Sequence, residues 1–208
     1  VVEKTIFKKS LNGFVHNDCS LSKNEHLWLI TGPNMAGKST FLRQNAHIII
    51  LAQIGSYVPA KQAKIGIASK LFSRIGASDN ISKGQSTFMV EMLETSNIIK
   101  NADDKSFIIL DEIGRGTSTY DGLAIAWAII EKVLRSNKSR TLFATHYHEL
   151  TEIEKTNSKV RNVSCEIKEW NDEIIYSYKI IEGKSKGSLG IKVAELAGFP
   201  KDVTKHAN

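Results

Sequence analysis

The sequence feature that most constrains the fold is a nine-residue stretch, Gly32-Pro33-Asn34-Met35-Ala36-Gly37-Lys38-Ser39-Thr40. It fits the phosphate-binding pattern G-x-x-x-x-G-K-[ST]. A short apolar run of buried-strand type, residues 27–31, precedes it, and residues 39–54 carry apolar side chains at helical spacing. A loop in this position surrounds a phosphate with backbone N–H groups at the positive end of a helix dipole. The stretch therefore predicts a P-loop of an α/β fold, in which Lys38 reaches the β- and γ-phosphates of a nucleotide and Ser39 ligates Mg²⁺.

Two further apolar strands are expected, and both end in side chains suited to nucleotide chemistry. Residues 107–110 lead into a Walker B pattern, in which Asp111 holds Mg²⁺ and Glu112 orients and deprotonates the attacking water. Residues 140–145 lead into His146, which suits a γ-phosphate sensor or a water-positioning residue. Because ligands of open α/β sheets bind outside the carboxyl ends of the strands, the three strand ends should converge on one nucleotide.

Two other residues have both a structural and a functional interpretation. Ser86 precedes a segment with apolar residues at helical spacing, so its hydroxyl is either a simple N-cap or a γ-phosphate ligand at a second helix N-terminus. Phe14 lies 18 residues before Gly32 and is either a core aromatic or one face of an adenine site. The residues alone favour the structural interpretation of both. The sequence His146–Glu149 lacks the H-E-x-x-H spacing, so it does not indicate a zinc site.

Composition limits the class of protein. A chain of 208 residues predicts one domain with at most a small appendage. The two cysteines are isolated, which argues against a disulfide framework and favours a reducing, cytoplasmic compartment. No apolar run has membrane-spanning length. The net charge is +6, but the lysines are scattered, so direct DNA contact by this chain is a minority interpretation. Because the sequence begins at Val1, we expect a fragment of a longer protein.

The order of segments predicts two parts. Residues 1–188 should form the P-loop ATPase domain, with short β segments at 1–7 and 14–18, a strand at 71–75, a polar loop at 151–162, and a β-hairpin made by residues 163–170 and 174–181. Residues 189–208 should begin a helix-turn-helix segment. Dimerisation suits this segment better than DNA reading, because no basic residues cluster on its second helix.

Together these residues resemble the C-terminal ATPase domain of the MutS family of DNA mismatch-repair proteins. The resemblance runs from about Val1 to Lys205, and its most specific pieces are Thr31–Thr40, Gln53–Ala60, Ser86–Met92, Asp111–Trp127 and Ala144–Tyr147. It implies an ABC-type ATPase fold with a mostly parallel central sheet flanked by helices and an added β-hairpin. It also implies Mg²⁺-dependent hydrolysis of ATP.

The resemblance further implies partners and two residue roles. Two subunits pair so that Ser86 of one faces the nucleotide of the other, and Phe14 forms one side of an adenine slot with Tyr178 opposite, where the family often has His. Family members bind mismatched double-stranded DNA with N-terminal domains that this chain lacks. ATP binding then converts the dimer to a mobile clamp that recruits downstream repair proteins, so use at the nucleoid is implied. Ala36 and Gln85 depart from a more usual Gly and Arg, and Ser188-Leu189-Gly190 from a more usual Ser-Tyr-Gly.

Two other functions compete with this interpretation. The first is the nucleotide-binding subunit of a membrane transporter, because Ile81–Gln85 weakly resembles the Leu-Ser-Gly-Gly-Gln signature of that class. The segment after it carries Phe, Met and Glu rather than the expected basic residues. The second is a dimerisation module that binds ATP without hydrolysing it, which is consistent with a composite site that needs a partner.

Overall fold

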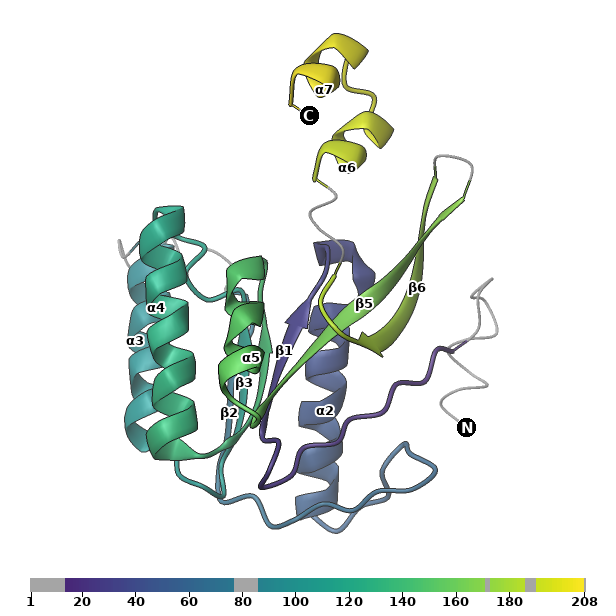
Figure 1. Cartoon of the computed structure of the whole chain (residues 1–208). Coiled ribbons are helices and arrows are strands. Elements are labelled where there is room, and N and C mark those ends of the chain that lie inside the picture. The colour runs from purple at the N-terminus through teal and green to yellow at the C-terminus, as the bar shows by residue number, and fades with distance from the viewer. Residues whose placement is uncertain (1–13, 77–85, 171–172, 186–189, 208) are drawn as a thin grey trace.

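Six strands form one sheet in the computed structural model, which describes residues 14–76, 86–170, 173–185 and 190–207 (Figure 1). Within these residues the order is β2-β3-β4-β1-β5-β6. Every neighbouring pair is parallel except β5 and β6, which form an antiparallel hairpin. The strands are β1 (Leu27–Thr31), β2 (Leu71–Arg74), β3 (Phe107–Asp111), β4 (Arg140–Ala144), β5 (Val160–Trp170) and β6 (Glu173–Glu182). The predicted mostly parallel sheet with an added hairpin is confirmed.

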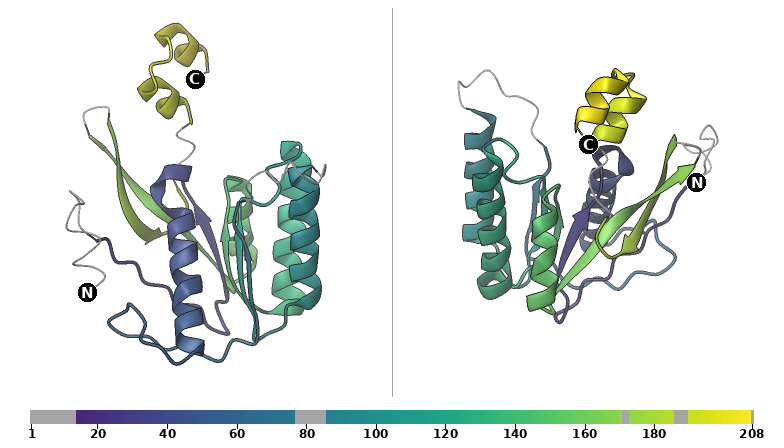
Figure 2. Two further views of the ribbon diagram at one scale, coloured as in Figure 1. Left: turned by 180° about the vertical axis from the view of Figure 1, so that it is seen from behind. Right: turned by 45° about the horizontal axis from the view of Figure 1, so that its top comes forward.

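Helices cover both faces of the sheet (Figures 1 and 2). On one face, α2 packs through Phe41 and Leu42 against alternate residues of β1, β3 and β4. On the other face, α3, α4 and α5 pack against the remaining strand residues around Phe143 and Ile130. The helical segments are η2 (Asn34–Ala36), α2 (Lys38–Gln53), α3 (Thr87–Asn101), α4 (Thr119–Lys132), η4 (Val133–Asn137), η5 (His148–Glu152), α5 (Ile153–Thr156), α6 (Gly190–Leu196) and α7 (Lys201–Ala207).

The central strands are buried in the sheet because their sequences are continuous apolar runs. Every residue of β1 and of β3 is buried, as expected for parallel strands covered on both faces. Because β1 lies between β4 and β5, and β3 lies beside β4, the residues after β1, β3 and β4 emerge at the same edge. This edge, the carboxyl edge of the sheet, carries the P-loop and the Walker B acids.

Two sequence predictions about the fold are wrong. Residues 14–18 form no strand, and residues 151–162 are not a polar loop but contain parts of η5, α5 and β5. In the second case, the buried Asn162 donates from Nδ2 to the Thr151 carbonyl and to Glu154, so long-range contacts order a polar stretch. The β segment expected at 1–7, the departures at Gln85 and at 188–189, and the boundary at 188/189 lie outside the described residues.

A bulge in β6 explains why residues 14–18 remain irregular. Opposite Glu166, β6 carries three residues instead of one, and Tyr178 there has a left-handed φ of 57°. Asn17 bonds to the bulged backbone, donating from Nδ2 to the Tyr178 carbonyl and accepting from the Ile180 amide. Side-chain bonds therefore attach the N-terminal segment to β6, in place of a backbone ladder.

The two short helices α6 and α7 stand apart from the sheet and pack on each other (Figure 1). They lie on the side of the molecule to which the carboxyl edge points. Four large apolar side chains of α6, α7 and the turn between them are exposed: Val193, Leu196, Phe199 and Val203. Among the described residues, no helix is long and apolar enough to span a bilayer.

Candidate nucleotide-binding site

The P-loop has the local structure that its sequence predicts. After β1 the chain makes the single turn η2, and Gly37 then takes a left-handed φ of 97° as the N-cap of α2. A side chain at this position would be strained, whereas glycine adopts the conformation freely. Ala36 occupies the place of a more usual glycine, but it lies in η2 without a positive φ and buries its methyl group. Ala36 is therefore compatible with the loop.

Lys38 begins α2 with its side chain inside the loop. It is 1% exposed, and its Nζ donates to the Gly32 carbonyl at 2.5 Å. Burial lowers the pKa of Lys38, while Glu112 and Asp111 oppose this effect. The hydrogen bond to the Gly32 carbonyl therefore holds the ammonium group inside the loop.

Ser39 and Asp111 meet across the sheet edge. The Ser39 hydroxyl donates to Asp111 Oδ2 at 2.6 Å, which joins the first turn of α2 to the end of β3. Asp111 Oδ1 is buried and has no hydrogen-bond partner among the described residues. Burial raises the pKa of Asp111, although the Ser39 hydrogen bond and Lys38 oppose the shift. A buried, partly unsatisfied carboxylate beside a hydroxyl fits the oxygen ligands that Mg²⁺ prefers.

Glu112 follows Asp111 with an unusual backbone conformation. Its φ is 53°, a left-handed value that is uncommon for a non-glycine residue, and its amide donates to the Ala144 carbonyl of β4. The carboxylate forms an ion pair with Arg115, with Oε2 and Nη1 separated by 2.6 Å. Strained backbone that surrounding contacts hold in place is typical of functional sites.

His146 lies just beyond the end of β4, with its ring 4.1 Å from the Tyr147 ring between centroids. Partial desolvation lowers the pKa of His146, and the positive charges of Arg115 and Lys38 add to that effect against Glu112. The imidazole is therefore largely neutral at pH 7 and is able to hydrogen-bond as donor and acceptor.

The P-loop and Walker B side chains line one pocket. A cavity of about 190 Å³ is lined by Lys38, Ser39, Arg43, Ile75, Gly76, Asp111 and Glu112. The structure thus brings together side chains from the ends of β1 and β3, and the end of β4 lies beside them because Asp111 pairs with Ala144 in the sheet. Arg43 was not predicted as a site residue, although its position one helical turn after Ser39 would have placed it on the same face.

Ser86 is the N-cap of α3, and its Oγ accepts from the Met89 amide at 3.2 Å. The hydroxyl is exposed, as are the nearby side chains of Met89 and Leu93. The structure therefore shows the capping role. The role toward a partner's nucleotide remains a proposal, because only one chain is described.

Tyr178 and Phe14 are each 44% exposed. The Tyr178 ring lies against the P-loop, since a Cβ added at Gly37 would be 3.3 Å from its Cδ1. Asn17, three residues after Phe14, is bonded to the Tyr178 carbonyl. The bulge in β6 therefore places an exposed aromatic ring beside the phosphate loop.

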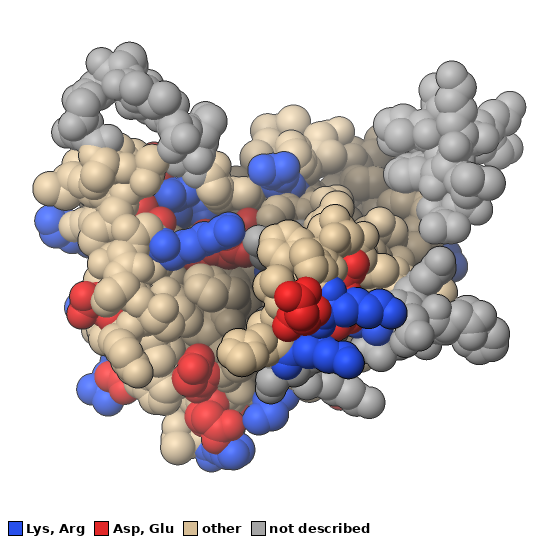
Figure 3. Space-filling view, turned by 90° about the horizontal axis from the view of Figure 1, so that it is seen from above, with Lys and Arg blue, Asp and Glu red and all other residues tan. Residues whose placement is uncertain are grey.

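Charge on the carboxyl-edge face does not indicate a nucleic-acid surface. Figure 3 shows this face from above, with basic and acidic side chains mixed where described residues cover it. Arg115, in the loop after β3, is paired with Glu112. The visible face therefore lacks the one-signed patch that phosphate backbones attract.

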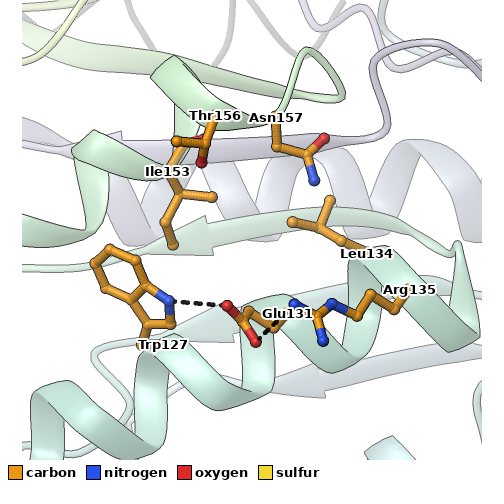
Figure 4. A pocket seen from close by; sticks show the side chains of 7 residues that line it. All are labelled: Trp127, Glu131, Leu134, Arg135, Ile153, Thr156 and Asn157. Carbon is orange, nitrogen blue, oxygen red and sulfur yellow. Dashed lines mark hydrogen bonds and ion pairs between the residues drawn. The ribbon is translucent and has the colours of Figure 1, made fainter.

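A larger pocket of about 260 Å³ lies elsewhere, between α4 with η4 and the segment around α5 (Figure 4). Its polar groups satisfy one another: Trp127 Nε1 donates to Glu131, and Glu131 pairs with Arg135. This pocket has none of the P-loop or Walker B residues in its lining. It is a contact region between helices and not a candidate site.

The loop after Walker B packs unusually closely on α4. A Cβ added at Gly122 would be 2.2 Å from Tyr147 Oη and 2.3 Å from the Gly114 carbonyl oxygen. We expect Gly122→Ala to lower the free energy of unfolding by about 3 kcal/mol, measured by urea denaturation, because backbone must move to admit the methyl group. Gly66→Ala is the matched control, since nothing lies within 4 Å there. Equal stability of the two variants would contradict the packing described.

A P-loop between a buried strand and a helix, with a Walker B aspartate bonded to its serine, defines a P-loop nucleotide-binding domain. Comparisons with known proteins agree. A family model described as MutS domain V matches residues 28–208. The DNA mismatch repair protein MutS of Orientia tsutsugamushi (strain Ikeda) is 56% identical over 207 residues, covering 100% of this chain and 23% of that protein.

Other relatives give the same result. The DNA mismatch repair protein MutS of Ruegeria sp. (strain TM1040) is 54% identical over 209 residues, covering 100% of this chain and 24% of that protein. The MutS of Thermodesulfovibrio yellowstonii is 56% identical over 195 residues, covering 93% and 23%. The chain belongs to the MutS domain V family, which is the ATPase domain of these proteins. It spans about a quarter of the length of the curated relatives it matches. The transporter interpretation is therefore wrong.

Proposed function

We propose that this chain binds and hydrolyses Mg²⁺-ATP at the carboxyl edge of its sheet. The observation that carries the proposal is the contact of Ser39 with Asp111, whose second oxygen is buried without a partner among the described residues. Ser39 and Asp111 would hold Mg²⁺, which supplies charge neutralisation on the phosphates when bound. Lys38 and the backbone N–H groups of residues 32–40, apart from Pro33, bind the β- and γ-phosphates.

Glu112 and His146 act on the attacking water in this proposal. Glu112 orients the water and accepts its proton as the water oxygen bonds to the γ-phosphorus and the bond to the leaving ADP oxygen breaks. Its position, one residue beyond Asp111, supports the role, as does the strained backbone that holds it. The neutral His146 ring positions the water or contacts the γ-phosphate.

Phe14 and Tyr178 form the two sides of the adenine site in this proposal. The exposed Tyr178 ring beside Gly37 supports it. We expect Tyr178→Ala to weaken ATP binding about tenfold in equilibrium titrations, because base stacking on an aromatic ring is lost. Tyr178→Phe keeps the ring and should bind as the parent does. Tyr57→Ala, which changes a 99% exposed tyrosine beyond the far end of α2, is the matched control. Loss in the control or in the Phe variant would contradict the stacking role.

The complete site includes a second subunit. We infer that Ser86 contacts the nucleotide of the partner subunit, and that residues 189–208 contribute to the dimer. The exposed N-terminus of α3, with Met89 and Leu93 beside it, and the exposed apolar residues of α6 and α7 support this arrangement. In the whole protein, nucleotide state is then coupled to mismatched DNA, in keeping with relatives named DNA mismatch repair proteins. Clamp formation and recruitment of downstream repair proteins are the part of this proposal that the sequence resemblance alone implies.

The experiment that tests this function is ATP turnover measured across protein concentration, followed by mixing of two inactive variants. Activity per subunit should rise as dimers form. Lys38→Met and Ser86→Ala homodimers should each be inactive or slow, and mixing them should restore activity, because one composite site of each heterodimer is intact. No restoration would contradict the contribution of Ser86 to the partner's site. Turnover that is absent at every concentration would favour a dimerisation module that only binds ATP.

A further inference from the structure

A buried carboxylate outside the nucleotide pocket contacts the loop that carries Glu112. Glu91, on α3, accepts a hydrogen bond from the Gly114 amide at 2.6 Å. The Glu91 side chain is 8% exposed, and Arg74 at the end of β2 lies 3.5 Å away and is 6% exposed. Because a buried carboxylate retains its charge only with close partners, these two contacts fix its position.

The other side of the same peptide segment is also held. Tyr147 is 4% exposed and donates from its hydroxyl to the Gly114 carbonyl at 2.9 Å. Gly114 is thus bonded through its N–H to α3 and through its C=O to the residue after His146. Glu112, two residues earlier, is bonded to β4 through its own amide, and Ile113 between them is fully buried.

The loop also packs directly on the first turn of α3. A Cβ added at Gly116 would be 2.9 Å from Phe88 Cβ, so the loop backbone lies against the turn that Ser86 caps. A movement of α3 would therefore be transmitted to the Walker B loop by packing as well as by the Glu91 hydrogen bond.

We propose that Glu91 and Tyr147 are positioning residues for ATP hydrolysis, which clamp Gly114 from two sides and thereby fix the direction of the Glu112 carboxylate. The inference rests on the proposed function of Glu112. Neither residue touches the nucleotide pocket, so their loss changes the rate of hydrolysis and not the affinity for ATP. Glu91 lies five residues after Ser86, which caps the same helix. The clamp therefore also connects the N-terminus of α3, which we propose faces the partner subunit, to Glu112 of the same subunit.

The test measures kcat and the Kd of ATP for variants of the intact protein. Glu91→Ala and Tyr147→Phe should each lower kcat by about tenfold or more with Kd unchanged, since small misplacement of a reacting group is costly. Glu91→Gln keeps an oxygen acceptor for the Gly114 amide and should recover most of the rate. The matched control is Glu94→Ala, which removes the other carboxylate paired with Arg74, at 2.9 Å, from a half-exposed position.

The deciding measurement repeats both variants in a Glu112→Gln background, by single-turnover kinetics. A residue that acts through Glu112 has nothing left to position there, so neither change should slow hydrolysis further. Additional loss in that background, equal loss in Glu94→Ala, or parental kcat in Tyr147→Phe would each overturn the proposal. If Glu91→Ala does not fold, Tyr147→Phe carries the test. Parental activity of Glu112→Gln alone would instead contradict the proposed function.

Discussion

Replacing Glu112 by Gln is expected to slow ATP hydrolysis by about 10²–10⁴-fold while ATP binding stays intact. The reason is that the two acidic residues at the end of β3 have different proposed roles. Asp111 is bonded to Ser39 beside the proposed metal position, whereas Glu112, which lines the same pocket, forms an ion pair with Arg115. Gln has the same shape and is able to hydrogen-bond to water, but it cannot accept the proton.

The measurement is steady-state turnover together with equilibrium ATP binding. Glu131→Gln is the matched control, because it removes a carboxylate from the pocket between α4 and α5, away from the carboxyl edge. That variant should hydrolyse ATP at the parental rate. Parental turnover in Glu112→Gln, or a large loss of affinity, would remove Glu112 from the proposed role.

Replacing Lys38 by Met is expected to weaken ATP binding by about 10²-fold, since one partner of a desolvated charge pair is lost. Met fills nearly the same volume without the charge. The folded protein should remain within about 1 kcal/mol of the parent, because the buried ammonium group already costs desolvation energy, as its lowered pKa indicates. The variant should therefore separate nucleotide binding from stability.

Equilibrium titration with ATP and urea denaturation of the same samples check this prediction. Lys70→Met is a control that removes an exposed lysine, paired with Asp103 away from the nucleotide pocket. Strong ATP binding by Lys38→Met would show that the phosphates lie elsewhere. A large loss of stability would show that Lys38 supports the loop and would leave its phosphate role to be judged from the remaining folded protein.

Local pattern was sufficient to predict which strand ends meet at the carboxyl edge of the sheet. The P-loop, the Walker B acids and His146 each follow a buried apolar strand, and parallel pairing brings such ends to one edge. The hairpin and the cap at Ser86 were likewise visible in short stretches of sequence. These features depend on neighbours in the chain, which a single sequence displays.

The features that the sequence did not reveal depend on distant contacts. Glu91 accepts a hydrogen bond from an amide 23 residues away, so its position in the helical pattern does not predict a contact with the loop after Asp111 and Glu112. Asn162 is buried because it hydrogen-bonds to Thr151 of η5 and Glu154 of α5. The polar composition of residues 151–162 predicted an exposed loop, because these bonds are not visible in the sequence. The irregular course of residues 14–18 follows from the bulge at Tyr178, more than 160 residues later. Tertiary contacts determine the conformation of each of these segments.

The most direct test of the central claim is a structure of the intact dimer with Mg²⁺ and a non-hydrolysable ATP analogue. We predict one metal ion beside Ser39 and Asp111, the γ-phosphate within reach of Lys38 and His146, and Ser86 of the partner subunit closing the other side. A nucleotide bound away from the carboxyl ends of β1, β3 and β4, or a site completed without the second subunit, would contradict the account.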